Sequence, residues 1–167
     1  MPALGEAEQA YAEALAMPLG AGEVAEDAQA AVARLSEELQ AANQAVGEAL
    51  ARYRPFFEDE ALGPVARTRA GDLLDAHAAR VGAVRLPLPR DMREQLAEAS
   101  PDIRAEVERV FDEGIGEAMA RRAGRLYCLA MQHYRAAGTE RARAQLARYG
   151  ASFVSRCPTE GERAPPD

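Results

Sequence analysis

The sequence predicts an all-α fold, a bundle of six or seven helices built from antiparallel helical hairpins. Alanine, leucine, glutamate, arginine and glutamine dominate the 167 residues, and these are good helix formers. Isoleucine occurs only at positions 103 and 115, and no stretch of five or more residues alternates between apolar and polar side chains. Strand signals are therefore missing, while helical periodicity recurs along the chain.

A first helix is expected over residues 5–17, ended by Pro18 and the glycine-containing run after it. Residues 23–53 then predict one long helix. Its apolar positions follow one another in alternating steps of three and four, the heptad pattern of helices that pack side by side. They are Ala25, Ala28, Val32, Leu35, Leu39, Ala42, Val46, Ala49 and Tyr53. This heptad seam either packs on a helix of the same chain or docks a second copy or a partner helix.

Pro55 ends the long helix, and Pro64 fits the first position of a helix over about 64–82. Residues 84–90 follow, with two prolines at alternate positions, and this spacing predicts an extended strap. We treat the strap as the one candidate sub-boundary within a single domain that covers residues 1–150.

The second half of the chain predicts four more helical segments. A short one is expected over 91–98. Ser100 and Pro101 signal the start of a helix that runs to about 113, with Ile103, Val107, Val110 and Phe111 facing inward. Gly114 and Gly116 predict a kink or break.

Residues 115–137 are expected to be the most buried helix, because 126–131 is apolar on every side. Thr139 caps a last helix over 140–149. Residues 151–167 contain three prolines and predict a flexible C-terminal tail.

Charge is distributed unevenly around a net value of −7. Residues 1–60 contain twelve acidic residues and three arginines, whereas residues 120–156 contain eight arginines and one acidic residue. These are either two solvated faces or two lobes that attract different partners. The chain has no lysine, which excludes Schiff-base enzymes and P-loop nucleotide binders.

The sequence gives only broad expectations about the compartment. No apolar stretch approaches 18 residues, so no membrane span is predicted. The first residues lack the basic and apolar regions of a signal peptide, which favours a cytoplasmic protein, or an exported one whose signal has been removed. Cys128 and Cys157 form no recognisable motif and are expected to be reduced.

No motif indicates a metal, a cofactor or catalysis. The two histidines, His77 and His133, lack the Glu-x-x-His pattern and any zinc spacing, and are expected at the edge of the core in neutral form. No serine lies in a Gly-x-Ser-x-Gly motif, and Cys128 lies in an apolar run. Acidic pairs at helical spacing predict solvated faces, with a cation site or an acid–base pair as the alternative: Asp72 with Asp75, Glu108 with Asp112, and Glu113 with Glu117.

We therefore expect a non-enzymatic interaction or scaffold protein that docks a protein partner or itself. Its candidate contact residues come from the heptad seam and from an arginine-rich C-terminal surface: Val32, Leu35, Leu39, Val46, Arg121, Arg122, Arg125, Arg141, Arg143 and Arg148. The alternative is a small-ligand binder or enzyme whose inter-helix pocket uses a histidine and a carboxylate. A third hypothesis, a helix-turn-helix-like nucleic-acid binder, is disfavoured by the isoelectric point near 5.0 and the single asparagine.

Overall fold

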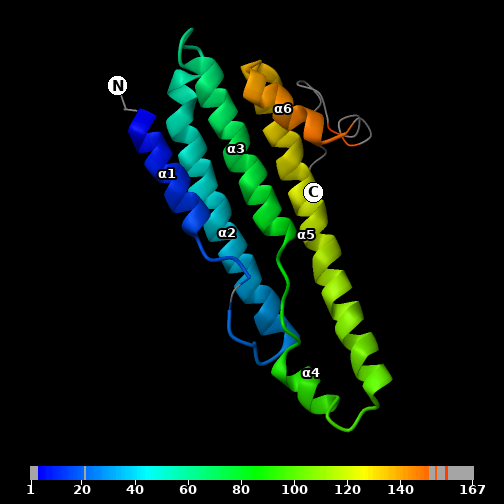
Figure 1. The fold of residues 1–167 in the computed structure, drawn as a ribbon. Helices are drawn as coiled ribbons and strands as arrows, with labels where there is room; N and C mark the ends of the chain where they lie inside the picture. Colours follow the sequence, from blue (N-terminus) through cyan, green and yellow to red (C-terminus); the bar gives the residue numbers. More distant parts are fainter. Residues whose placement is uncertain (1–3, 21, 151–152, 154–156, 158–167) are drawn as a thin grey trace.

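The computed structural model describes residues 4–20, 22–150, 153 and 157, and this part of the chain is all-helical, as predicted (Figure 1). It contains six α-helices and one 3-10 turn: α1 Leu4–Ala16, α2 Ala28–Tyr53, η1 Arg54–Phe56, α3 Gly63–Gly82, α4 Arg90–Gln95, α5 Pro101–Ala137 and α6 Glu140–Arg148. α1, α2, α3 and α5 lie side by side, α6 lies at one end of α5, and α4 lies at the opposite end of the molecule (Figure 1). All but two residues of the predicted tail lie outside the described residues.

Polar caps fix the helix ends that the sequence predicted best. The Ser100 side chain accepts a hydrogen bond from the Ile103 N–H, and the Thr139 side chain accepts one from Ala142 at 3.1 Å. Gly138 ends α5 in the left-handed conformation, with φ of 62°. A residue with a side chain would be strained there, so the chain turns from α5 into α6 at glycine.

α2 begins later than the predicted start at residue 23. Asp27 caps it by accepting the N–H of Ala30 at 2.7 Å. The residues just before Asp27 are not helical, and two of their carbonyl groups accept hydrogen bonds from the end of the strap and the start of α4: the Arg90 N–H donates to Ala25 and the Asp91 N–H donates to Glu26, both at 2.9 Å. These long-range bonds compete with helix formation, and the helical pattern of the local sequence does not reveal them.

α5 is continuous through Gly114 and Gly116, so the predicted break there was wrong. A glycine inside a helix costs about 1 kcal/mol relative to alanine, which is too little to interrupt a helix anchored by packing on both sides. Phe111, Ile115 and Ala118 supply that anchoring, since all three pack against the buried cluster shared by α2, α3 and α5.

The centre of the fold is α3 and not the segment 115–137 that we expected to be most buried. More than half of the residues of α3 are buried, including Leu73, Leu74 and His77. In α5, Leu129 is 46% exposed, and the predicted core residues Ile103 and Val110 are 54% and 55% exposed. Ile103 and Val110 therefore form an exposed apolar edge on the first half of α5, whose inner side packs through Phe111 and Ile115.

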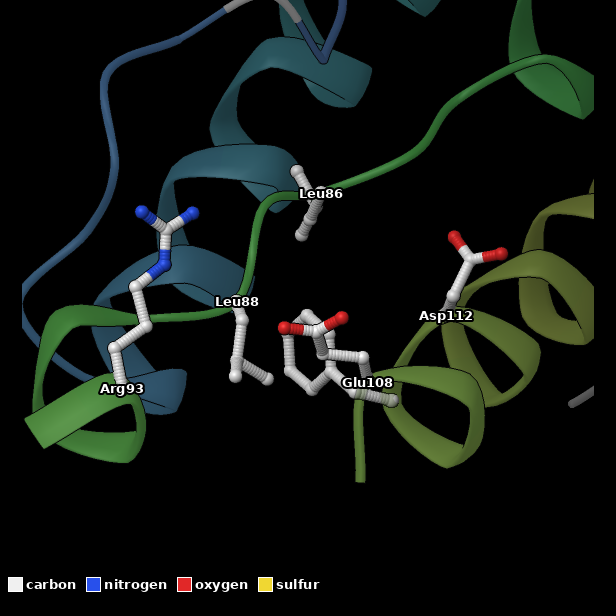
Figure 2. Close-up of a pocket in the computed structure, with 6 residues that line it drawn as sticks. Leu86, Leu88, Arg93, Glu108 and Asp112 are labelled. Carbon is white, nitrogen blue, oxygen red and sulfur yellow. The ribbon is translucent and has the colours of Figure 1, made fainter. Parts of the chain in front are cut away.

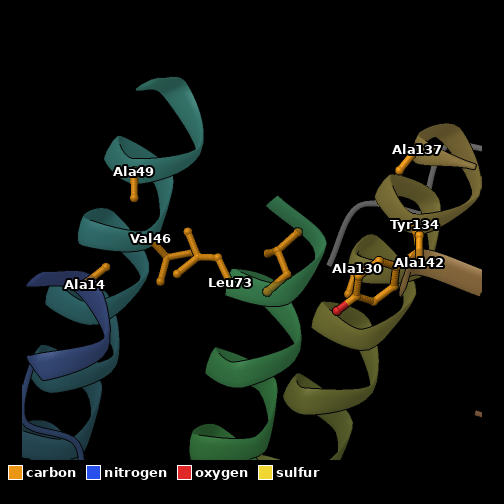
Figure 3. Packing of buried hydrophobic residues seen from close by; sticks show 9 residues of the cluster. Ala14, Val46, Ala49, Leu73, Ala130, Tyr134, Ala137 and Ala142 are labelled. Carbon is orange, nitrogen blue, oxygen red and sulfur yellow. The ribbon is translucent and has the colours of Figure 1, made fainter. Parts of the chain in front are cut away.

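α3 and α5 approach closely because Gly71 faces the ring of Tyr134. A Cβ atom at position 71 would lie 2.6 Å from the Tyr134 ring, so only glycine fits this contact. Val46 of α2 and Leu73 of α3 face each other in the same core cluster (Figure 3). The α3–α5 contact thus combines small residues such as Gly71 and Ala130 with the Tyr134 ring, whereas branched side chains meet on the α2 side of α3.

A buried carboxylate links the helices around this contact. Asp72, predicted to lie on a solvated face, is buried, with a side chain only 6% exposed. Its Oδ1 accepts a hydrogen bond from the Tyr134 hydroxyl at 3.0 Å, and its Oδ2 lies 2.9 Å from the Arg141 guanidinium. Arg69 lies 3.8 Å from the same oxygen and binds both carboxylate oxygens of Glu8 on α1. Burial and the neighbouring Asp72 charge raise the pKa of Tyr134.

Cys128 and Cys157 form a disulfide, contrary to the prediction of reduced thiols. The two cysteines are 29 residues apart, so no short motif announces the pairing. The bond attaches Cys157 to α5, and Phe153 lies near Tyr127 of α5 and Tyr149.

The Gly71 contact predicts opposite effects for two glycine substitutions. Gly71→Ala should lower the free energy of unfolding by about 1–3 kcal/mol, because the buried Tyr134 ring has no room to move. Gly47→Ala is the matched control: no atom lies within 4 Å of its Cβ position, so alanine should stabilise α2 by about 0.5–1 kcal/mol. Urea denaturation of both variants measures the difference, and equal effects would contradict the close approach of α3 and α5.

Candidate functional site

Most residues of the heptad seam pack against other helices of the same chain. Leu35, Leu39 and Val46 are buried against neighbouring helices, while Val32 is 50% exposed. A partner could contact the three buried positions in full only if α2 separated from those neighbours. Of the two interpretations of the seam, the fold favours packing inside the chain.

The six candidate arginines separate into three groups. Arg141 is committed to the buried Asp72, and Arg121 lies 3.7 Å from Glu117. Arg143 and Arg148 lie on α6, where Arg148 donates to Gln145 at 2.6 Å. Arg122 and Arg125 are exposed, and no acidic group of the described residues lies within ion-pair distance of either. The predicted arginine-rich surface therefore contains arginines that already pair within the chain and others that could contact a partner.

Arg122 and Arg125 stand at one wall of a groove of about 410 Å³ between α2, α3 and α5. α3 lies between α2 and α5 and packs mainly against α5, while α2 packs mainly against α1 (Figure 1). Because α3 separates α2 from α5, these two helices do not meet over α3, and the groove is the space that remains between them. Apolar side chains from all three helices line this space: Leu39, Val46, Leu50, Leu74, Val81, Leu126 and Leu129.

The uncharged polar side chains of the groove are those of His77 and Asn43. His77 is fully buried, and its Nε2 lies 2.8 Å from the Asn43 Oδ1. With that oxygen as acceptor, Nε2 carries the proton and Nδ1 is left as an acceptor without a partner among the described residues. Burial, together with the nearby Arg80 charge, lowers the pKa of His77 and keeps the imidazole neutral.

The sequence predicted a neutral histidine at the edge of the core, whereas His77 is fully buried, and it did not reveal the Asn43 partner. Asn43 follows Leu39 by four residues and precedes Val46 by three, so helical spacing puts all three near one face of α2. That spacing, and the fact that Asn43 is the only asparagine, were the available signals. The second histidine, His133, is elsewhere and lies 5.4 Å from the Phe57 ring.

Two other cavities are lined differently. One, of about 500 Å³, lies between the strap and α5, where Glu108 extends from α5 toward Leu88 and Asp112 borders the same space (Figure 2). Its charged groups are exposed, and Asp112 is already 3.5 Å from Arg85. Another, of about 380 Å³, is bordered by Asp75, which accepts from the Tyr149 hydroxyl. Neither contains a buried polar group without a partner, so the α2–α3–α5 groove is the better candidate site.

Comparison with protein-family models, with curated proteins and with solved structures found no match to this chain. Within the described residues, no three histidine, cysteine or acidic side chains gather as they would around a metal ion. The described helices also include none with the length and apolar character needed to cross a membrane. The α2–α3–α5 groove therefore provides the structural information on function.

The buried His77 predicts acid sensitivity. Its folded-state pKa is below the ordinary value of 6.5, so below that pH the unfolded chain binds a proton that the folded chain does not. The His77 contribution is fully present above pH 6.5 and is lost as the pH falls toward the folded-state pKa.

The slope from this single group cannot exceed about 1.4 kcal/mol per pH unit. Denaturation between pH 7.5 and pH 5 should show this loss in the wild type and in His133→Gln, and a flatter profile in His77→Leu. A His77→Leu profile that matches the wild type would contradict the neutral, buried histidine.

Proposed function

We propose that the protein is a non-enzymatic docking protein whose α2–α3–α5 groove binds an amphipathic helical segment of a protein partner. The bound segment has acidic residues beside its own apolar face. The observation that carries this proposal is the pair of uncommitted arginines, Arg122 and Arg125, next to the 46% exposed Leu129. In this proposal α1–α2 and α3–α5 act as helical hairpins that hold the two walls of the groove apart.

The proposal assigns different tasks to the apolar and charged groups. Burial of apolar surface supplies about 25 cal/mol per Å², so the lining leucines that are still partly exposed, Leu50, Leu126 and Leu129, would provide most of the affinity. An exposed ion pair contributes only about 0–1 kcal/mol. Arg122 and Arg125 would therefore select the partner's charge and orientation, as rim charges do in other interfaces.

The chemistry of the lining supports binding over catalysis. Of the residues that line the groove, none is an aspartate or glutamate. General acid–base catalysis by His77 would need an accessible proton donor or acceptor beside it, whereas its Nε2 is occupied by the Asn43 carboxamide. A histidine–carboxylate pair of the kind expected from the sequence is therefore not assembled in this groove.

A second candidate function is the binding of a small amphipathic anion, such as a medium-chain carboxylate. Arg122 and Arg125 at the groove favour this candidate, because a guanidinium forms charge-assisted hydrogen bonds with a carboxylate. The groove volume of about 410 Å³ also lies in the range of small-molecule sites. A nucleic-acid partner is less well supported, since Arg141 is already paired with Asp72.

Two labelled helical peptides test the docking proposal. Each has leucines at positions i, i+3, i+4 and i+7, and they differ only in flanking glutamates or lysines. Fluorescence anisotropy should show that the wild type prefers the glutamate peptide by at least about tenfold, because Arg122 and Arg125 attract its flanks. The R122E/R125E variant should reverse that preference.

Arg143→Glu is the matched control, because it also reverses an exposed arginine but lies on α6, outside the groove. It should keep the wild-type preference. Equal binding of both peptides by the wild type, or an equal change in R143E, would overturn the docking proposal. Saturable binding of dodecanoate without peptide binding would favour the second candidate instead.

A further inference from the structure

The charges of α5 are separated along its length. Residues 101–117 contain six acidic residues and two arginines, whereas residues 118–137 contain four arginines and no acidic residue. One half of the helix thus has a net charge of −4 and the other half +4. An antiparallel copy of the same helix would place each half against a half of opposite sign.

The outer edge of α5 has the spacing that such pairing requires. Val110, Gly114, Glu117, Arg121 and Gly124 follow one another in steps of four, three, four and three. This is the heptad spacing of residues that share one helix face. We call these five residues the α5 stripe. The stripe is separate from the face of α5 that packs on α3, where Met119, Ala123 and Ala130 are buried.

The stripe is also uncovered. Val110 is 55% exposed, and a Cβ atom at either Gly114 or Gly124 would meet no other atom within 4 Å. Glu117 and Arg121 are 3.7 Å apart within the chain, with side chains 74% and 69% exposed. Such an exposed pair contributes little to stability, so both charges remain available for a second molecule.

We propose that a second copy of this chain docks on the outer edge of α5, antiparallel and related by a two-fold axis. In this register Glu117 faces the second copy's Arg121, Gly114 faces the second copy's Gly124, and the symmetry repeats both contacts. Glycine opposite glycine allows the helices to approach closely, and the two exchanged ion pairs fix the orientation. A partner of uniform charge would repel one half of the helix.

The paired stretch, residues 114–124, stops short of the disulfide-bonded Cys128 and is about 15 Å long at 1.5 Å per residue. An interface this short is at the weak end of specific association, so the dimer forms in a concentration-dependent way. The proposal does not rest on the groove, because Arg122 and Leu129 lie about 80–100° from Arg121 around the helix, although Arg125, four residues after Arg121, lies beside the stripe. Loss of dimerisation and loss of peptide binding are therefore separate results.

Charge reversal tests the proposal by sedimentation equilibrium of the full chain between about 5 and 500 µM, a range suited to weak interfaces. Glu117→Arg and Arg121→Glu should each weaken self-association by at least about tenfold, because each creates two contacts between like charges. The double variant E117R/R121E restores both ion pairs and should recover the wild-type association. Arg143→Glu should leave it unchanged.

A cysteine pair tests the register. The described chain has no free cysteine, so thiols introduced by G114C/G124C report only on the new positions. Oxidation should give a covalent dimer of the double variant, whereas Gly114→Cys alone should give none, because its two copies lie about 15 Å apart in this register. A wild type that is monomeric at every concentration, or a dimer insensitive to the charge reversals, would overturn the proposal.

Discussion

The contact between Gly71 and Tyr134 is the constraint on which the rest of the structure depends. The missing side chain at Gly71 admits the Tyr134 ring, and the ring carries its hydroxyl to the buried Asp72. A buried carboxylate is costly unless it is paired, and Arg141 of α6 and Arg69 of α3 lie beside it. Arg69 in turn holds Glu8 of α1, which also accepts from the Tyr53 hydroxyl of α2 at 3.0 Å. One close helix approach thus organises five helices through a single chain of polar contacts.

The same approach explains why a groove exists. Small residues let α3 lie close to α5, but alanine-rich surfaces extend little side-chain volume toward a third helix. α2 is attached mainly to α1, and α3 separates it from α5. The space above α3 is therefore bounded by side chains that no helix of the described chain covers, such as Leu129. The groove therefore results from the close packing of α3 on α5, and no additional helix or loop is needed to form it.

Much of the fold, but little of the site, could be predicted from the sequence. Local signals were sufficient for the helical class and for the caps at Ser100 and Thr139, because a cap acts over three residues. The role of Asp72 could not be predicted, since its partner Tyr134 is 62 residues away and the local pattern of Asp72 and Asp75 resembles a solvated face. The heptad seam identified the buried side of α2, but periodicity does not distinguish a partner inside the chain from one outside it. Periodicity also does not show which positions of the seam are covered: Val32 and Leu35 were predicted together, but Val32 is exposed and Leu35 is buried.

The arginines show most clearly how folding divides residues of one type between stability and function. Arg141 forms an ion pair with the buried Asp72, which needs a counter-charge. Arg122 and Arg125 pair with no acidic side chain of the described residues and lie beside exposed apolar surface. Arg121, only one position before Arg122, points about 100° away on the helix and joins the stripe with Glu117 instead. α5 therefore presents two unlike surfaces on adjacent faces: an apolar groove with positive charge, and a self-complementary charged edge. Because the faces are distinct, a dimer formed at the edge would display two grooves related by the two-fold axis. Two partner segments could then be bound at once, and avidity would compensate for the modest affinity of each groove.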